Sequence, residues 1–365
     1  AGSGLGTGIL AIPYAASKTG FYSIVLFIII AYAVSTVLHI LTADLVLHSK
    51  NSSQLIGIFR EHLFRGKYGN ILTLFFFVIL AIVLFLNLPI YIIVASDVLI
   101  TILHLSDTMA KIIFYGVSSL IVFFGIKIIV LSEKYSMILI FLVVLYLSVL
   151  SRWNIKRDLD FTFGNPMKAL ALYGVLMFSF SALFSVPQVV NNIENKSKIK
   201  FAVIAGIGAN ALITVVFTIA VLIASEETTT VATIGLSRSI GHASQTACSI
   251  FVLLAMFTSY WSIALAQLDI IHEQTKLNKK LCWLAATVPT LFISIFLPAT
   301  YISYIQIAGG SVAVIIGCLL LPAYYNSIVN SNDKLLLGTI GKSKSLLLFI
   351  FVCYLIMALS SFIKI

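Results

Sequence analysis

The sequence predicts an all-α membrane protein that crosses the bilayer many times. The prediction rests on the composition, on the length of the apolar runs and on where the charged residues lie. Of 365 residues, 60% are hydrophobic and 10% are charged, and the mean hydropathy is +1.10. Soluble domains carry roughly 25% charged residues. The apolar runs are continuous and exceed the roughly 10-residue alternating strands of a membrane barrel. We therefore exclude soluble and disordered classes, and we expect no enzyme, since hydrolase, metalloprotease and P-loop motifs are absent.

A spanning helix needs about 20 mostly apolar residues, and runs of about this length follow one another along the chain. They cover residues 21–48, 69–101, 109–131, 134–152, 167–193, 199–225, 243–272, 279–298, 301–328 and 343–363. Residues 2–17 form a shorter apolar piece, which we interpret as the second half of a first helix that has lost its opening turns. The prediction is one transmembrane domain of eleven helices over residues 1–365.

The placement of Lys and Arg predicts the orientation. With a cytoplasmic N-terminus, 15 of the 23 basic residues fall on the cytoplasmic side and 8 on the outer side. The outer eight are Lys18, Lys111, Arg152, Lys156, Arg157, Lys168, Arg238 and Lys364. The positive-inside rule then places the N-terminus in the cytoplasm and the C-terminus outside. We therefore read the net charge of +10 as that of a cell-membrane protein in a lipid bilayer, with no nucleic acid as partner, and we expect a monomer.

Glycines interrupt the first apolar piece. Residues 2–13 read GSGLGTGILAIP. Four glycines alternate there ahead of a proline, namely Gly2, Gly4, Gly6, Gly8 and Pro13. Each Gly costs roughly 1 kcal/mol of helix stability relative to Ala. Unwound backbone at membrane depth is tolerated only where it lines a cavity or packs in protein. We expect the first helix to break here, with close helix packing as the alternative.

A second interruption lies in the sixth helix. Residues 178–187 read FSFSALFSVP, in which Ser hydroxyls can replace lost backbone partners ahead of Pro187. The two breaks are five helices apart, which is the signature of a five-plus-five inverted repeat. The expected repeats are residues 1–152, truncated at the N-terminus, and 167–328, followed by an extra eleventh helix at 343–363.

Two facing breaks suit a zwitterion. The half-helix that starts after Gly4 and Gly6 points unpaired N–H groups and the positive end of its dipole at the cavity, which favours a carboxylate. Unwound carbonyls near Phe178–Ser181 are acceptors for an ammonium group. On the third helix, Asn87 and Tyr91 stand one turn apart across Pro89, which we expect to bend the helix toward the site. The breaks therefore predict an α-amino acid site without charged side chains.

At this point the sequence resembles a known family. GSGLGTGILAIPYAASKTG, residues 2–20, resembles the opening motif of the amino acid/auxin permeases and the related aromatic amino acid permeases of the amino acid–polyamine–organocation superfamily. VPQVVNNIENKSK, residues 186–198, resembles the end of their sixth helix, and AMFTSYWSIALAQLDII, residues 255–271, their eighth. The resemblance implies a leucine-transporter-type fold and secondary transport of amino acids by alternating access.

The resemblance also assigns roles by position. It implies that Gly4, Leu5 and Gly6, followed by Thr7, meet the substrate carboxylate. It places the amine at the second break, on Phe178, Ser179, Phe180 and Ser181. Aromatic permeases often carry a His in this break, whereas Leu183 stands at the matching position here, a departure that bears on aromatic specificity.

A coupling cation has a candidate site on the eighth helix. Ala255, Thr258 and Ser259 share one helix face, and with the backbone near Gly2 and Ser3 they offer oxygen ligands to a hard cation such as Na+. In sodium-coupled members of the superfamily, a Thr/Ser pair on this helix plays that part. We expect no cofactor other than this ion.

Proton coupling is the alternative, and the residues favour it less. Asp44, Asp97 and Asp269 lie toward helix ends, where they can reach the interface. Residues 134–152 have no Lys in their middle, where some proton-coupled relatives place one. His39 lies in the second helix and could titrate, with a packed, hydrogen-bonded histidine as the alternative interpretation. Simple exchange also stays open, as does a transporter-like receptor of the germinant-receptor type, which binds an amino acid without net transport.

Overall fold

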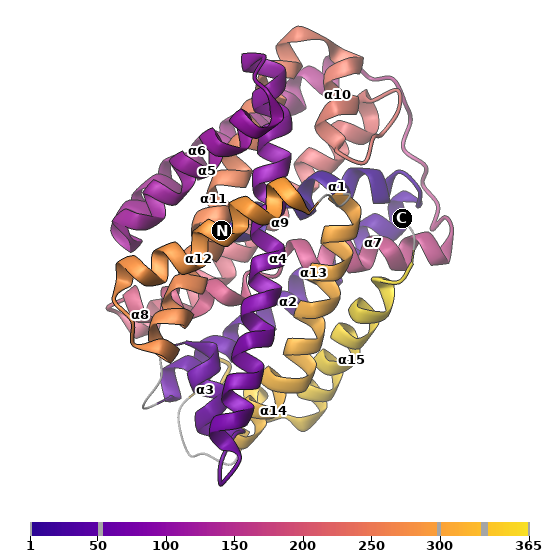
Figure 1. Cartoon of the computed structure of the whole chain (residues 1–365). Coiled ribbons are helices and arrows are strands. Elements are labelled where there is room, and N and C mark those ends of the chain that lie inside the picture. Colours follow the sequence, from indigo (N-terminus) through magenta and orange to yellow (C-terminus); the bar gives the residue numbers. More distant parts are fainter. Residues whose placement is uncertain (1, 50–53, 298–300, 330–334, 364–365) are drawn as a thin grey trace.

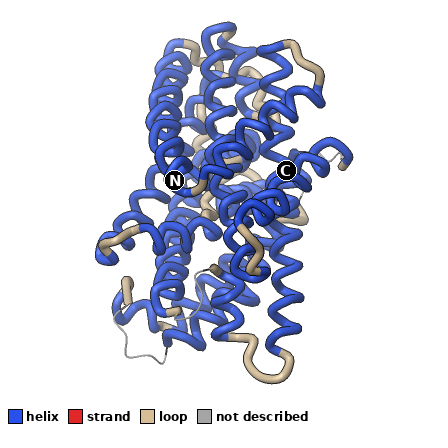
Figure 2. The backbone as a smooth tube through the Cα atoms, turned by 60° about the vertical axis from the view of Figure 1, so that its left-hand side comes forward, coloured by secondary structure: helices blue, strands red, loops and turns tan. Residues whose placement is uncertain are grey.

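The computed structural model describes residues 2–49, 54–297, 301–329 and 335–363, and these residues fold into an elongated bundle of helices (Figures 1 and 2). The first half of the bundle comprises α1 (Thr7–Ala16), α2 (Phe21–His48), α3 (Leu55–His62), α4 (Gly69–Leu103), α5 (Asp107–Phe124), α6 (Ile126–Trp153) and α7 (Pro166–Ser179). The second half comprises α8 (Val186–Asn192), α9 (Ile199–Ala224), α10 (Ala232–Ile240), α11 (His242–Thr275), α12 (Lys279–Phe296), α13 (Tyr301–Ile315), α14 (Leu321–Tyr324) and α15 (Lys344–Ser360). Pairing of the β type among these residues is limited to a bridge between Thr19 and Gly164.

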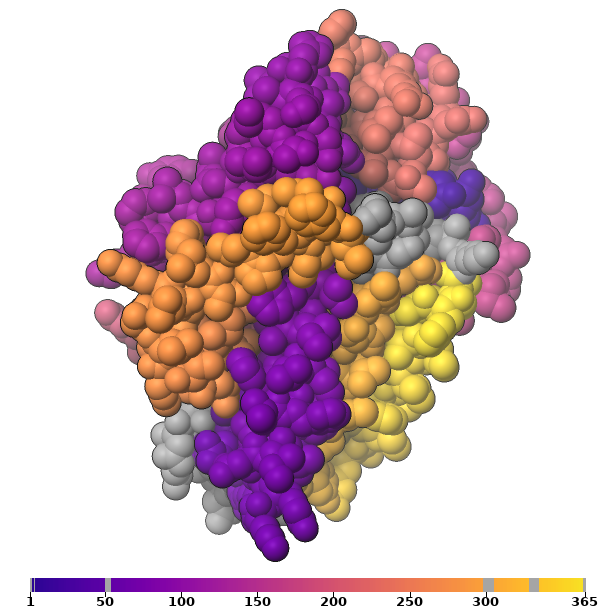
Figure 3. Space-filling model, viewed as in Figure 1, coloured from indigo at the N-terminus to yellow at the C-terminus, as the bar shows by residue number. Residues whose placement is uncertain are grey.

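Within the described ranges, nine helices are long and apolar enough to cross a membrane, and the shorter apolar helices α1 and α15 complete the predicted eleven. The outward faces of these helices are apolar. On α4, for example, Ile71, Phe75 and Ile82 are exposed. Figure 3 shows α4 running down the surface between α12 and the α13–α15 side. Such surfaces need a bilayer, because a soluble protein rarely exposes contiguous apolar patches of this extent.

The first helix breaks at Gly6. A 3₁₀ turn, η1, covers Gly2–Leu5, and Gly6 then adopts extended backbone angles (φ −61°, ψ −151°) ahead of α1. The break confirms that the alternating glycines interrupt the helix. The N-terminal N–H groups of α1 thus begin in the interior of the protein.

The sixth spanning segment breaks as well. Helix α7 ends at Ser179, Phe180–Ala182 leave the helical path, and a 3₁₀ turn, η2 (Leu183–Ser185), leads into α8. Pro187 lies in the first turn of α8, where a missing N–H costs nothing. Both predicted interruptions are therefore present.

The predicted border between the fourth and fifth helices is wrong. The expected runs were 109–131 and 134–152, whereas α5 ends at Phe124 and α6 begins at Ile126. Gly125 between them has φ +83°, a backbone conformation that residues other than glycine rarely adopt. Hydropathy missed the border because residues 126–131 are as apolar as the helix before them. The shift moves Glu133 from an expected connection into a spanning helix.

The helices form two groups around the breaks. Helices α1, α2, α7 and α9 pack against one another, and α4, α5, α11 and α12 do the same. The turn η1 packs on α11, while α6 contacts both α9 and α11. The broken segments consequently lie where the two groups meet.

Candidate functional site

A small cavity of about 30 Å³ lies between the two breaks. It is lined by Gly4, Gly6, Thr7, Gly8, Asn87, Tyr91, Phe178, Ser179, Ser181, Phe184, Ile263 and Val312. Most of the substrate residues expected from the sequence therefore meet at one place. Leu5 and Phe180 are fully buried in the surrounding core and do not line it. The sequence reasoning missed Phe184, Ile263 and Val312, because nothing in an apolar residue says which neighbour it will face.

Glycine is required where the segments touch. A Cβ atom on Gly6 would lie 3.0 Å from both Ser259 Oγ and Tyr91 Cε1. A Cβ atom on Gly8 would lie 2.8 Å from the Cβ of Ser179, across the two breaks. Real Cβ atoms rarely approach this closely, so the alternating glycines let α1, α4, α7 and α11 converge.

Asn210 on α9 lies against the first break at Gly4, and the sequence reasoning missed it. It is fully buried, and neither side-chain polar atom has a hydrogen-bond partner among the described residues. A Cβ atom on Gly4 would overlap its Nδ2. The hydroxyls of Ser179 and of Thr214, one turn further along α9, are likewise without partners. Buried polar groups are normally hydrogen-bonded. The amide of Asn210 and the two hydroxyls could therefore still form hydrogen bonds beside the break.

The contact between Gly4 and Asn210 gives a first prediction. We expect Gly4→Ala to lower the free energy of unfolding by about 1–3 kcal/mol, because the added methyl overlaps the Asn210 amide and approaches the Ser179 carbonyl at 3.3 Å. Adding Asn210→Ala should recover part of that loss by removing the overlap. Thermal unfolding of the two single variants and the double variant measures it. Strictly additive losses would contradict the contact.

His39 on α2 forms a hydrogen bond with the backbone of the second break. Its Nε2 accepts a hydrogen bond from the backbone N–H of Ala182 at 2.8 Å, and its Nδ1 lies 2.6 Å from Ser35 O. The geometry fits a neutral ring with the proton on Nδ1, donated to Ser35 O. The imidazole is thus a packed, hydrogen-bonded residue, and it satisfies a backbone group that the break leaves without a helical partner.

This bond leads to a second prediction. His39→Leu should lower the free energy of unfolding by about 1–3 kcal/mol, because the buried Ala182 N–H loses its acceptor. His39→Gln keeps a side-chain acceptor and should lose less. Unfolding temperatures of both variants in the same detergent measure the difference. Equal losses would indicate that packing, not the hydrogen bond, sets the effect.

The candidate cation residues meet at Gly2. Ser259 Oγ donates to Gly2 O at 3.1 Å, and Thr258 Oγ1 lies 3.4 Å from the same carbonyl. Thr258 Oγ1 also lies 3.1 Å from Ala255 O, on its own helix. The side chain of Ser3 is outside the described part of the chain. Hydroxyl and carbonyl oxygens of α11 and η1 therefore converge as expected.

The interpretation of Asp44 needs correction, and the neighbour of the Thr/Ser pair, Tyr260, does not line the central cavity. Asp44 does not reach an interface: it is fully buried, and its Oδ1 accepts a hydrogen bond from the Leu336 N–H at 2.9 Å. It therefore anchors the segment before α15. Tyr260, beside the Thr/Ser pair, turns away from the cavity toward Thr290 Oγ1 at 3.2 Å on α12.

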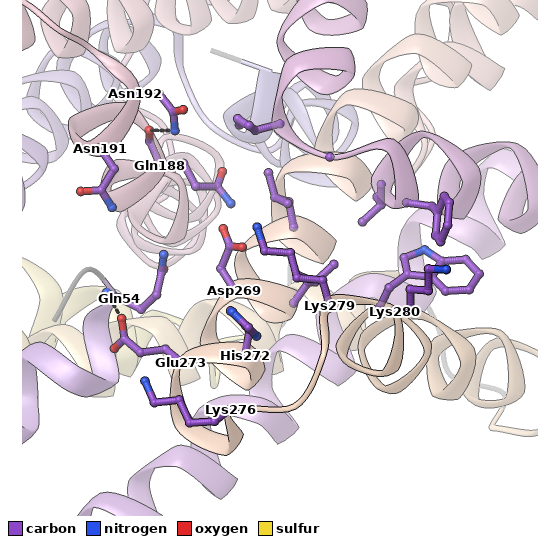
Figure 4. Close-up of a pocket in the computed structure, with 17 residues that line it drawn as sticks. Gln54, Gln188, Asn191, Asn192, Asp269, His272, Glu273, Lys276, Lys279 and Lys280 are labelled. Carbon is purple, nitrogen blue, oxygen red and sulfur yellow. Dashed lines mark hydrogen bonds between the residues drawn. The ribbon is translucent and has the colours of Figure 1, made fainter.

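Two larger cavities flank the central one along α11. One of about 470 Å³ lies among α4, α10 and the start of α11, near Asp97 and Arg238. Another of about 600 Å³ lies among α8, the end of α11 and the start of α12. Figure 4 shows its polar lining, in which Asp269 and Lys279 point toward one another. Open spaces thus approach the breaks from opposite ends of α11.

Comparison with known families decides the classification. The sequence profile of the tryptophan/tyrosine permease family matches residues 1–361, nearly the whole chain. The chain belongs to the tryptophan/tyrosine permease family. Among curated protein sequences, none matches this permease.

Solved structures show the fold of the permease. MhsT, solved in complex with L-phenylalanine, has a TM-score of 0.66 at 15% identity, over 99% of this chain and 96% of its own. Mhp1, a nucleobase-cation-symport-1 family transporter, has a TM-score of 0.69 at 13% identity, over 98% and 88%. A manganese transporter of Eremococcus coleocola has 0.66 at 14% identity, over 99% and 84%. The fold is thus the leucine-transporter type. Membership of a permease family makes the protein a multi-pass membrane transporter rather than an enzyme.

Proposed function

We propose that this permease is a secondary active transporter of α-amino acids that works by alternating access and is driven by a coupled cation. One observation carries the proposal: two helices break opposite each other and leave a cavity lined by backbone and neutral polar side chains. The N–H groups that open α1 favour a carboxylate. The carbonyls and hydroxyls at 178–181 favour an ammonium group, so the pair suits a zwitterion.

The substrate class follows from the lining. Tyr91, Phe178, Phe184, Ile263 and Val312 give the cavity an apolar wall beside the zwitterion groups. Such a wall suits an aromatic or large apolar side chain. Family membership supports tryptophan or tyrosine, and MhsT was solved with phenylalanine bound. The second break lacks the family's His, and His39 of α2 contacts that break instead.

The size of the cavities supports alternating access. Ligand pockets usually measure roughly 300–1,000 Å³, whereas the central cavity measures about 30 Å³. It is therefore too small for an amino acid in this conformation, and it lies between larger cavities at either end of α11. Substrate entry requires the two helix groups to separate at the breaks. With the N-terminus in the cytoplasm, as the basic residues favour, the cavity of Figure 4 is the cytoplasmic one.

Sodium is the coupling ion that the residues favour. Oxygens of Gly2, Ala255, Thr258 and Ser259 converge at the first break, and hard cations prefer oxygen ligands. His39, the titratable alternative in the second helix, is engaged by Ala182 and Ser35. These contacts favour Na+ over H+.

Uptake into proteoliposomes tests the proposal. Labelled tryptophan, tyrosine and phenylalanine should accumulate under an inward Na+ gradient, and a pH gradient in its place should drive less. Accumulation driven only by the pH gradient would assign coupling to protons. Saturable binding with no accumulation under any gradient would overturn transport and indicate a transporter-like receptor.

A further inference from the structure

A carboxylate lies beside the convergence of oxygens at Gly2. Glu133 belongs to α6, two turns after the helix begins, and its Oε1 accepts a hydrogen bond from Ser262 Oγ of α11. A Cβ atom on Gly2 would lie 2.9 Å from the same Oε1 and 3.0 Å from Thr258 Cβ. Three segments of the chain, η1, α6 and α11, therefore bring their oxygens to one point.

Glu133 is an acidic side chain inside a spanning helix. No basic side chain of the described residues forms an ion pair with it, and the adjacent Lys134 is exposed on another face of α6. An ionised side chain within a spanning segment is costly, and such groups mark ion or substrate pathways. Coordination by a cation would supply the missing countercharge.

The surroundings favour a small hard cation. The oxygen atoms near the Glu133 carboxylate that could ligate a cation are the Gly2 carbonyl and the hydroxyls of Thr258, Ser259 and Ser262. A hydroxyl can rotate its proton away and present a lone pair to an ion. Carboxylate, carbonyl and hydroxyl oxygens are ligands of hard cations. The set contains no nitrogen or sulfur ligand.

The same geometry provides access. Glu133 is partly exposed. Ile126 lies two turns before Glu133 on α6, and Leu265 lies one turn after Ser262 on α11; both line the cavity of Figure 4. Residues seven apart, or three apart, share a helix face. Ile126 and Glu133 therefore lie on one side of α6, and Ser262 and Leu265 on one side of α11, so the contact between these helices leads from the cavity lining toward Glu133.

We propose that Glu133 supplies the negative charge of the coupling-cation site, so that Na+ binds between its carboxylate, the Gly2 carbonyl and the hydroxyls of Thr258 and Ser259. The inference rests on the proposed cation coupling and adds to it a charged ligand from the fifth spanning helix. A carboxylate makes the site attract Na+ before substrate arrives, whereas neutral oxygens alone attract it far less.

Sodium binding to the full-length permease without substrate is the direct test. Unfolding temperature is measured against NaCl at constant ionic strength, with choline chloride as the balancing salt. We expect Na+ to raise it in the wild type. Glu133→Gln should raise the half-maximal Na+ concentration at least about tenfold, because the Coulomb attraction is lost. Glu133→Asp keeps the charge on a shorter side chain and should raise it less. Glu194→Gln, an exposed loop carboxylate, is the matched control and should change nothing.

The outcomes separate this inference from the proposed function. An unchanged half-maximal concentration in Glu133→Gln overturns the role of Glu133. If that variant does not fold, Glu133→Asp decides: a weakened Na+ response supports the role, and an unchanged one overturns it. Labelled tryptophan binding is measured on the same preparations. A wild type that binds tryptophan but gains nothing from Na+ overturns the inference together with the sodium coupling on which it rests, and leaves the amino acid substrate standing. A wild type that binds no aromatic amino acid overturns the proposed substrate instead.

Discussion

Replacing Gly6 with leucine should abolish substrate binding. Gly6 is the extended residue at the first break, and even a single Cβ there would come within 3.0 Å of Ser259 Oγ and Tyr91 Cε1. A full leucine side chain exceeds the central cavity of about 30 Å³ and lies where the carboxylate should meet the start of α1. We expect affinity for labelled tryptophan to fall at least about 100-fold, or roughly 2.7 kcal/mol. Equilibrium binding to purified protein measures it.

A glycine elsewhere in the membrane provides the control. Gly116 lies on the outer face of α5, and a Cβ there meets no atom within 4 Å. Gly116→Leu therefore adds the same bulk to a spanning helix without filling the site, and it should bind tryptophan like the wild type. Normal affinity in Gly6→Leu would mean that the glycine serves helix packing alone and that the substrate lies elsewhere.

Removing both hydroxyls of the Thr/Ser pair should eliminate sodium stimulation of uptake. In the double variant Thr258→Ala/Ser259→Ala, the Gly2 carbonyl loses both neighbouring hydroxyls of α11. Two of the proposed oxygen ligands disappear, and alanine offers none in their place. We expect uptake in a Na+ gradient to fall to the level measured without Na+, while the protein remains folded.

Other hydroxyls show whether the effect is local. Ser148 and Thr275 bond to the backbone of their own helices at 2.9 Å and 2.7 Å, away from the breaks. Ser148→Ala/Thr275→Ala removes the same chemical groups and should leave sodium stimulation intact. Stimulation that persists in Thr258→Ala/Ser259→Ala would exclude these side chains from coupling.

The broken helices were predictable because their cause is local. Alternating glycines destabilise a helix wherever they occur, and Pro187 fixes where a new helix begins. The same locality explains the error at Gly125. Its positive φ ends α5, yet a lone glycine among apolar residues gives hydropathy no signal.

The partners of the site were less predictable because they come from distant helices. His39 was identified as titratable, but its bond to Ala182 depends on α2 packing against α7. The sequence did not indicate that Asn210 belongs near the breaks, because a single asparagine in an apolar run predicts no particular contact. Only the structure shows that its amide lies against Gly4. The sequence placed Glu133 in a connection between two predicted helices, whereas in the structure it lies within α6.

By itself, the sequence determined that this chain is a membrane protein, how many apolar spanning segments its described residues form, and where two of these segments break. These properties depend on the transfer of apolar side chains into lipid and on local backbone preference, which neighbouring residues set. Only the tertiary structure decided that η1, α6 and α11 bring their oxygens together near Gly2, that Asn210 meets Gly4, and that the central cavity is small. Those contacts join residues far apart in the chain, and they depend on which face each helix turns toward its neighbours.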